Sequence, residues 1–132
     1  AVTSDYFPTS LAAAGIPLPN DREYDGINLL PLIDGKMKKR KGIGFHCRGM
    51  DAWIEKKYKI IRISSKKEQK NPWELYDLLK DPYEENDLAK KFPEVVERMN
   101  QEFTVWATSV QADEQKVLEK YHSFKTKNKK SK

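Results

Sequence analysis

The sequence is poor in cysteine, in histidine and in long apolar runs. Among its 132 residues there is one cysteine, Cys47, and there are two histidines, His46 and His122. A single cysteine excludes an intrachain disulfide, so cysteine content gives no information about the compartment, and the localisation stays unknown. No apolar run reaches the ~20 residues that a helix needs to cross a bilayer, and no signal peptide is recognisable, so no membrane partner is expected.

The composition allows a small core but not a large one. Hydrophobic residues make up 38% of the chain and charged residues 34%. This is lean for a compact domain, although it does not imply disorder throughout. The three tryptophans, Trp53, Trp73 and Trp106, can help to fill the core of a single domain. A partner or domain outside this chain could supply further buried surface. Because the chain begins at Ala1, within the approach to a helix, we expect a fragment or a processed product.

The positive charge is concentrated in two blocks. The formal net charge is +5. One block follows the first third of the chain and the other ends it: Lys36, Lys38, Lys39, Arg40 and Lys41, then Lys125, Lys127, Lys129, Lys130 and Lys132. Such blocks either bind an anionic polymer such as nucleic acid or form solvated linkers. Neither block is interleaved with aromatic residues that would stack on bases.

The first third predicts a helix followed by an extended connector. Ser4 or Asp5 can cap the helix, and Pro8 lies early enough for its missing N–H to cost little. Gly15 ends it, because glycine tolerates the left-handed conformation that closes a helix. Residues 16–42 predict an extended connection with a short helical turn at 29–33.

The rest predicts an antiparallel sheet and a long helix. Strands are expected at 43–47, 52–55, 58–63 and 73–78, with a polar loop at 64–72. A long helix then begins near Pro93 and continues to about Tyr121. Its apolar residues recur at helical spacing, which predicts packing on the sheet: Phe92, Val96, Met99, Phe103, Trp106 and Val110. The fold class is therefore α+β: a small antiparallel sheet of about four strands packed against a long C-terminal amphipathic helix, preceded by an N-terminal helix and an extended connector.

Two groups of motifs carry a resemblance to a known family. The first comprises residues 3–9 (TSDYFPT), 15–19 (GIPLP) and 25–32 (DGINLLPL), and the second residues 74–78 (ELYDL) and 81–88 (DPYEENDL). In this order and spacing they resemble the C-terminal part of the sulfatases, arylsulfatase-type hydrolases of sulfuric esters with an alkaline-phosphatase-like core. The resemblance extends over about residues 3–106.

The resemblance implies chemistry that these residues do not supply. Sulfatases use a formylglycine made from the cysteine of a Cys-x-Pro-x-Arg motif, or from a serine, together with a calcium ion. The segment that follows Cys47 has Gly49 and Asp51 where that motif has proline and arginine, and no serine fits the pattern. No carboxylate cluster offers calcium its oxygen ligands. We therefore expect no catalytic and no metal-binding residue here, no activity of the chain alone, and calcium and formylglycine in an N-terminal part outside it.

The resemblance also divides the chain and suggests its partners. Residues 1–35 resemble the end of the large sulfatase domain, residues 36–122 form the C-terminal subdomain, and residues 123–132 are expected to be a disordered basic tail. The expected partners are the N-terminal catalytic domain and, in the intact enzyme, a sulfated substrate. Self-association of the fragment through residues 1–35 is left open.

His46 and Arg48 are the candidates for substrate contact. They lie at the end of a strand, before a glycine turn, in the subdomain that borders the active-site mouth of sulfatases. A guanidinium can bind a sulfate or a uronate carboxylate with two parallel hydrogen bonds. The alternative is that both are ordinary surface residues. Cys47 is expected to be a small core residue, and His122 is expected to have no function.

Two other functions stay open. The chain could be a freestanding α+β interaction module that binds an anionic polymer through its lysine blocks, or a complete but divergent hydrolase. The sequence does not distinguish aryl sulfates, sulfated sugars and sulfamates as substrates.

Overall fold

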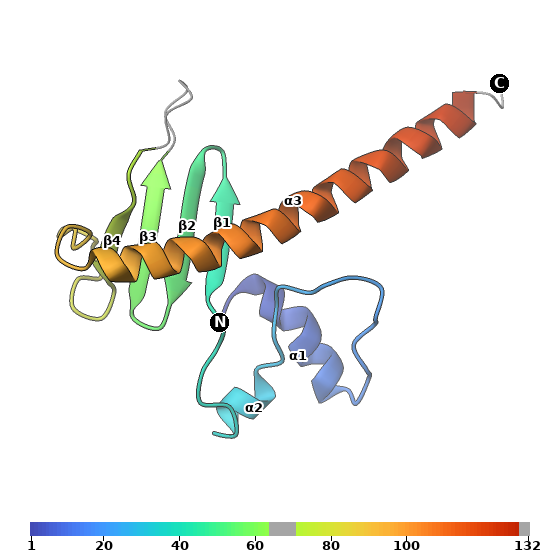
Figure 1. Ribbon diagram of the computed structural model, residues 1–132. Helices are drawn as coiled ribbons and strands as arrows, with labels where there is room; N and C mark the ends of the chain where they lie inside the picture. The colour runs from blue at the N-terminus through green and yellow to red at the C-terminus, as the bar shows by residue number, and fades with distance from the viewer. Residues whose placement is uncertain (64–70, 130–132) are drawn as a thin grey trace. The chain divides into compact units, whose positions relative to one another are not determined.

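The computed structural model describes residues 1–63 and 71–129, with side chains of the last helix described up to His122. The chain forms two compact units, Ala1–Ile43 and Gly44–Lys132. In the first unit a 3₁₀ turn, η1 (Thr3–Asp5), leads into α1 (Tyr6–Ala13), and α2 (Leu30–Ile33) follows after an extended segment (Figure 1). Gly15 has a positive φ of 69°, which closes α1 in the way the sequence predicts.

Asp5 organises the first unit. Its side chain is fully buried, and its carboxylate accepts hydrogen bonds from the backbone N–H groups of Val2 (2.9 Å) and Ile27 (3.0 Å). The same carboxylate forms an ion pair with Arg40. Burial alone would raise the pKa of Asp5, but the hydrogen bonds and the Arg40 charge outweigh it and lower the pKa from 3.8 to about 2. Asp5 thus occupies the predicted N-cap position of α1 but makes no side-chain cap hydrogen bond to that helix; its carboxylate instead joins Val2 to the distant Ile27 and Arg40.

The second unit is built on a four-stranded sheet in the order β1-β2-β3-β4. The strands are β1 (Ile43–Cys47), β2 (Met50–Glu55), β3 (Tyr58–Ile63) and β4 (Glu74–Asp77). The pairs β2–β3 and β3–β4 are antiparallel, with Trp53 opposite Ile60 and Ile60 opposite Leu75. Because side chains alternate between the faces of a strand, these three residues lie on one face of the sheet.

Helix α3 (Pro93–Lys129) covers that face. It crosses all four strands and continues beyond β1 (Figure 1). The buried core joins the helix to the sheet: Trp53, Ile60, Leu75, Met99 and Phe103. Two tryptophans in the sheet half also donate hydrogen bonds to the helix, Trp53 to Glu102 (3.1 Å) and Trp73 to Asn100 (2.8 Å). The indole rings thus fix the register of the helix as well as filling the core.

The structure confirms the predicted fold class, including the sheet, the long helix and its apolar face. The predicted strands 43–47 and 58–63 agree with β1 and β3, and β2 begins two residues earlier than predicted, at Met50. Helix α3 begins at Pro93 as predicted but runs to Lys129 instead of ending near Tyr121. The predicted loop 64–72 lies largely outside the described residues. The division at residue 35 and the disorder of 123–132 stay predictions.

The Asp5 site generates a prediction about acid stability. Because the pKa of Asp5 is below its ordinary value of 3.8, ionised Asp5 stabilises the fold above about pH 4, and this contribution is lost as the pH falls towards 2. Asp5→Asn should destabilise the first unit by about 2 kcal/mol at neutral pH, measured as faster hydrogen exchange of residues 2–29. The loss should shrink at about pH 3. Asp34→Asn, which removes only the exposed Asp34–Lys36 pair, should change little. An equal loss at both pH values would contradict this assignment.

The contact between Gly44 and α3 gives a second prediction. A Cβ atom on Gly44 would lie 2.2 Å from the Trp106 ring, so Gly44→Ala must displace the helix or the indole. We expect a loss of about 2 kcal/mol in the free energy of unfolding, measured by urea denaturation. The double variant Gly44→Ala/Trp106→Leu should be less destabilised than the sum of its single variants predicts, because the clash is gone. Additive losses would refute this close packing.

Candidate functional site

The two candidate residues lie close together at the end of β1: His46 is in the strand, and Arg48 is in the tight turn that leads to β2. Arg48 and Gly49 form the centre of this turn, and both have positive φ, 45° and 85°. Two-residue turns of this kind match the twist of antiparallel strands. The second position carries glycine, which accepts positive φ without cost, but Arg48 holds a conformation that costs a side-chain-bearing residue about 1 kcal/mol or more. Exposed Arg48 makes no ion pair with a described residue.

Asp51, three residues after Arg48, holds His46. The Asp51 side chain is 7% exposed, whereas that of His46 is 62% exposed. Nδ1 of His46 lies 2.6 Å from Oδ1 of Asp51. The other carboxylate oxygen, Oδ2, accepts a hydrogen bond from Nε of Arg62 (2.8 Å) and forms an ion pair with Nη2 of the same guanidinium (2.7 Å). A single buried carboxylate therefore joins an exposed imidazole on β1 to a guanidinium on β3.

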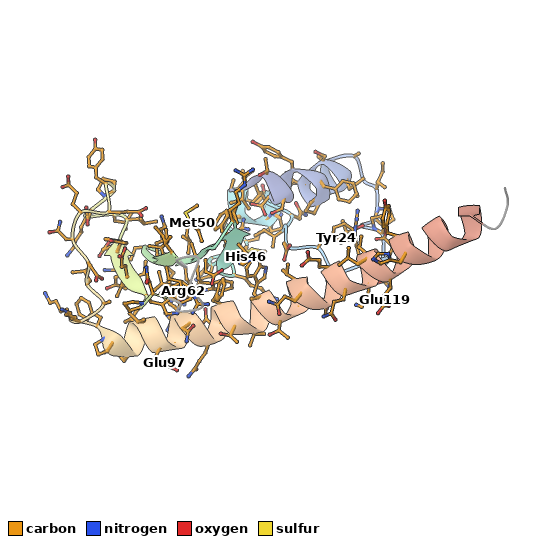
Figure 2. All side chains as sticks on the ribbon, turned by 90° about the horizontal axis from the view of Figure 1, so that it is seen from above. Tyr24, His46, Met50, Arg62, Glu97 and Glu119 are labelled. Carbon is orange, nitrogen blue, oxygen red and sulfur yellow. The ribbon has the colours of Figure 1, made fainter. Side chains whose placement is uncertain are left out.

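Arg62 extends this chain of contacts into the core. Its guanidinium lies over the ring of Trp73, with 4.2 Å from Cζ to the ring centroid, and 5.6 Å from the ring centroid of Phe103. Figure 2 shows Arg62 on the side of the sheet that faces α3, and Met50 on the opposite side. Cation–π contacts hold the guanidinium in place. The position of His46 thus depends on the packing between sheet and helix.

The charges of the site favour an ionised Asp51. Burial would raise the pKa of its carboxyl, but the hydrogen bonds from His46 and Arg62 outweigh burial and hold the pKa below its ordinary value. An ionised carboxylate can only accept hydrogen bonds. The proton between His46 and Asp51 therefore belongs to Nδ1 of the imidazole.

The structure brings His46 and Arg48 to the same end of the sheet, and both are exposed. The expectation for Cys47 is wrong: it is exposed, because it ends the edge strand β1. Sequence analysis missed Asp51 and Arg62, whose partners are 5 and 11 residues away. The only signal was the alternation of strand residues, which places Asp51 and Arg62 on the same face as Trp53 and Ile60.

The first lysine-rich block is partly engaged in contacts of its own. Arg40 is committed to the buried Asp5, and Lys36 pairs with Asp34 at 3.0 Å. Within 1–63 and 71–129, the structure contains no group of three or more His, Cys, Asp or Glu residues that could hold a metal ion. The residues present therefore do not fit a calcium site. In the same part of the chain, no helix has the length and apolar character that crossing a membrane requires.

The sheet face opposite α3 carries exposed apolar side chains. Met50 and Ile63 are opposite each other on β2 and β3 and are 44% and 55% exposed. Phe45 on β1, which precedes His46 and so points to this face, is 44% exposed. Large exposed apolar residues that gather on one face are typical of a surface that another protein part covers.

Comparison with known proteins shows similarity to sulfatases. No family model matches the chain. It is 51% identical over 35 residues to human steryl-sulfatase and 54% identical over 37 residues to human N-acetylgalactosamine-6-sulfatase. These matches cover 26% and 27% of this chain but only 6% and 7% of those proteins.

A solved structure extends the likeness to most of the chain. It is a sulfatase studied in the metabolism of glycosaminoglycans by Bacteroides thetaiotaomicron, and it matches with a TM-score of 0.63 and 28% identity. The match covers 79% of this chain and 24% of the Bacteroides protein. The chain thus corresponds to about a quarter of that sulfatase.

Proposed function

We propose that this chain, which is related to sulfatases and has the fold of their C-terminal region, is the C-terminal part of a sulfuric ester hydrolase. It completes the fold of a catalytic region outside the chain and borders the substrate cleft of that region. The nucleophile and the calcium ion would belong to the catalytic region, because the described residues offer neither the motif nor the ligands. No step of sulfate hydrolysis is assigned to this chain.

The observation that carries the proposal is the arrangement of the sheet. One face is closed by α3, while the other exposes Phe45, Met50 and Ile63. His46 and Arg48 lie at one end of this sheet: Arg48 is in the β1–β2 turn, and His46 is on β1, with its side chain on the α3 side, where it contacts Asp51. A catalytic domain seated on the apolar face would bring these two residues to its border, where their exposed nitrogens can contact a sulfated substrate.

Arg48 suits an anionic group of the substrate. Its guanidinium has five N–H donors and no ion-pair partner among the described residues. It can therefore bind a sulfate or carboxylate with two parallel hydrogen bonds. Its positive φ also supports a functional role, because a strained residue at a turn persists where its side chain is needed.

The alternative of a freestanding module that binds an anionic polymer has less support. The first lysine-rich block uses Arg40 for the buried pair with Asp5, so fewer of its charges are available. Retention on heparin with a steep dependence on salt, lost when residues 125–132 are removed, would favour this alternative.

The proposal is tested by joining the chain to a catalytic region. The chain alone should not hydrolyse an aryl sulfate. Fused to the N-terminal region of N-acetylgalactosamine-6-sulfatase, in place of the C-terminal region, it should support measurable hydrolysis, whereas the N-terminal region alone should be inactive. Replacing Phe45, Met50 and Ile63 together by serine should abolish this support while the isolated chain keeps its circular dichroism. Turnover by the isolated chain would overturn the proposal, as would an inactive, folded fusion protein.

The strained turn residue allows a sharper prediction. Arg48→Asn should raise the free energy of unfolding by about 0.5–1 kcal/mol, because asparagine tolerates positive φ better. In the active fusion protein it should raise the KM for a sulfate ester about tenfold, through loss of the guanidinium contact. Lys56→Asn is the matched control, because Lys56 has the same strained conformation (φ 54°) in the β2–β3 turn. It should gain similar stability without a change in KM. An unchanged KM in Arg48→Asn would exclude Arg48 as a substrate contact.

A further inference from the structure

Asp51 is a buried carboxylate that neither the resemblance nor the comparisons explain. It lies on β2 and is 5% exposed. The carboxylate has two neighbours of different kinds: Arg62 from the core side, with a hydrogen bond and an ion pair to Oδ2, and His46 from the solvent side, on Oδ1. Arg62 already compensates the negative charge of Asp51. The contact with His46 is therefore not required to stabilise the buried carboxylate.

We infer that Asp51 is a positioning residue, which keeps the imidazole proton of His46 on Nδ1 and leaves Nε2 to accept a hydrogen bond from the substrate. This rests on the proposed function and deepens it. The bare Nε2 is a hydrogen-bond acceptor, so the group it recognises is a hydroxyl of a sulfated sugar. The anionic group is left to Arg48. The site would then distinguish a sulfated sugar from an aryl sulfate, which has no hydroxyl at that position.

The tautomer follows from the geometry. Free imidazole can carry its proton on either nitrogen, and the hydrogen bond of one nitrogen decides the state of the other. At 2.6 Å from Nδ1, the carboxylate of Asp51 can only accept. A charge-assisted hydrogen bond is worth about 1.5–3 kcal/mol, which corresponds to at least a tenfold preference for the Nδ1–H form.

Arg62 fixes the orientation of the Asp51 carboxylate towards His46. Its Nε donates a hydrogen bond to Oδ2, its Nη2 forms an ion pair with the same oxygen, and its stacking on Trp73 fixes the guanidinium. The carboxylate therefore cannot turn away from His46 without losing this hydrogen bond and ion pair. In Asp51→Asn the remaining oxygen would face Arg62, which only donates, and the amide N–H group would face His46. Nδ1 would then have to accept, and the proton would move to Nε2.

The first experiment measures the imidazole nitrogens of the full chain by NMR at about pH 8.5, where histidines are neutral. His46 should show the Nδ1–H form in at least tenfold excess, and His122, which is far from Asp51 in the sequence, serves as the internal reference. Asp51→Asn should reverse the preference of His46 and leave His122 unchanged. If Asp51→Asn fails to fold, the native chain still decides: a His46 that carries its proton on Nε2 overturns the inference.

The second experiment uses the active fusion protein. Asp51→Asn should raise the KM for a sulfated sugar about tenfold, as should His46→Ala, and in both variants the KM for an aryl sulfate should rise much less than the KM for the sugar. A loss that affects both substrates equally would mean a structural role and would contradict the inference. The two proposals fail separately: an inactive fusion protein refutes the proposed function, whereas the tautomer in the isolated chain tests Asp51 without it.

Discussion

The packing of α3 against one face of the sheet is the constraint on which the second unit depends. Trp53, Ile60 and Leu75 supply the sheet side of this core, and Met99 and Phe103 supply the helix side. The hydrogen bonds of Trp53 and Trp73 to the helix add direction to a contact that would otherwise be only apolar. Because the chain has few hydrophobic residues, it can build one such core but not close the second face of the sheet as well.

The candidate site is an extension of this core. The rings of Trp73 and Phe103 support Arg62, Arg62 holds Asp51, and Asp51 holds His46. The series ends at the surface: the side chains of Arg62 and Asp51 are 13% and 7% exposed, and that of His46 is 62% exposed. A flexible surface histidine thereby gains a defined orientation, at the cost of burying a carboxylate. That cost is acceptable because both oxygens of the carboxylate are paired.

The proposed separation between this chain and a catalytic region outside it agrees with the relationship to sulfatases. The chain matches about a quarter of a solved sulfatase, and the described residues contain no cluster that could hold calcium. What they do offer is an apolar sheet face, an exposed histidine at the end of β1 and an exposed arginine in the turn that follows. Under the proposed function, these features would dock the chain on a catalytic region and add selectivity to it. The buried pair of Asp5 and Arg40 plays a comparable supporting role in the first unit, where it joins residues far apart in sequence.

The order of the elements, the antiparallel strands and the apolar face of α3 could all be predicted from the sequence. They follow from local signals: glycine and proline at the boundaries, β-branched residues in strands, and apolar residues at helical spacing. The candidates His46 and Arg48 came from their place before a turn together with what the resemblance to sulfatases implies, and they stay predictions. The tertiary structure alone decided the roles of Asp5, Asp51 and Arg62 and the exposure of Cys47. Each depends on a partner from another segment, and a side chain acquires such a partner only when the sheet and the connector have folded.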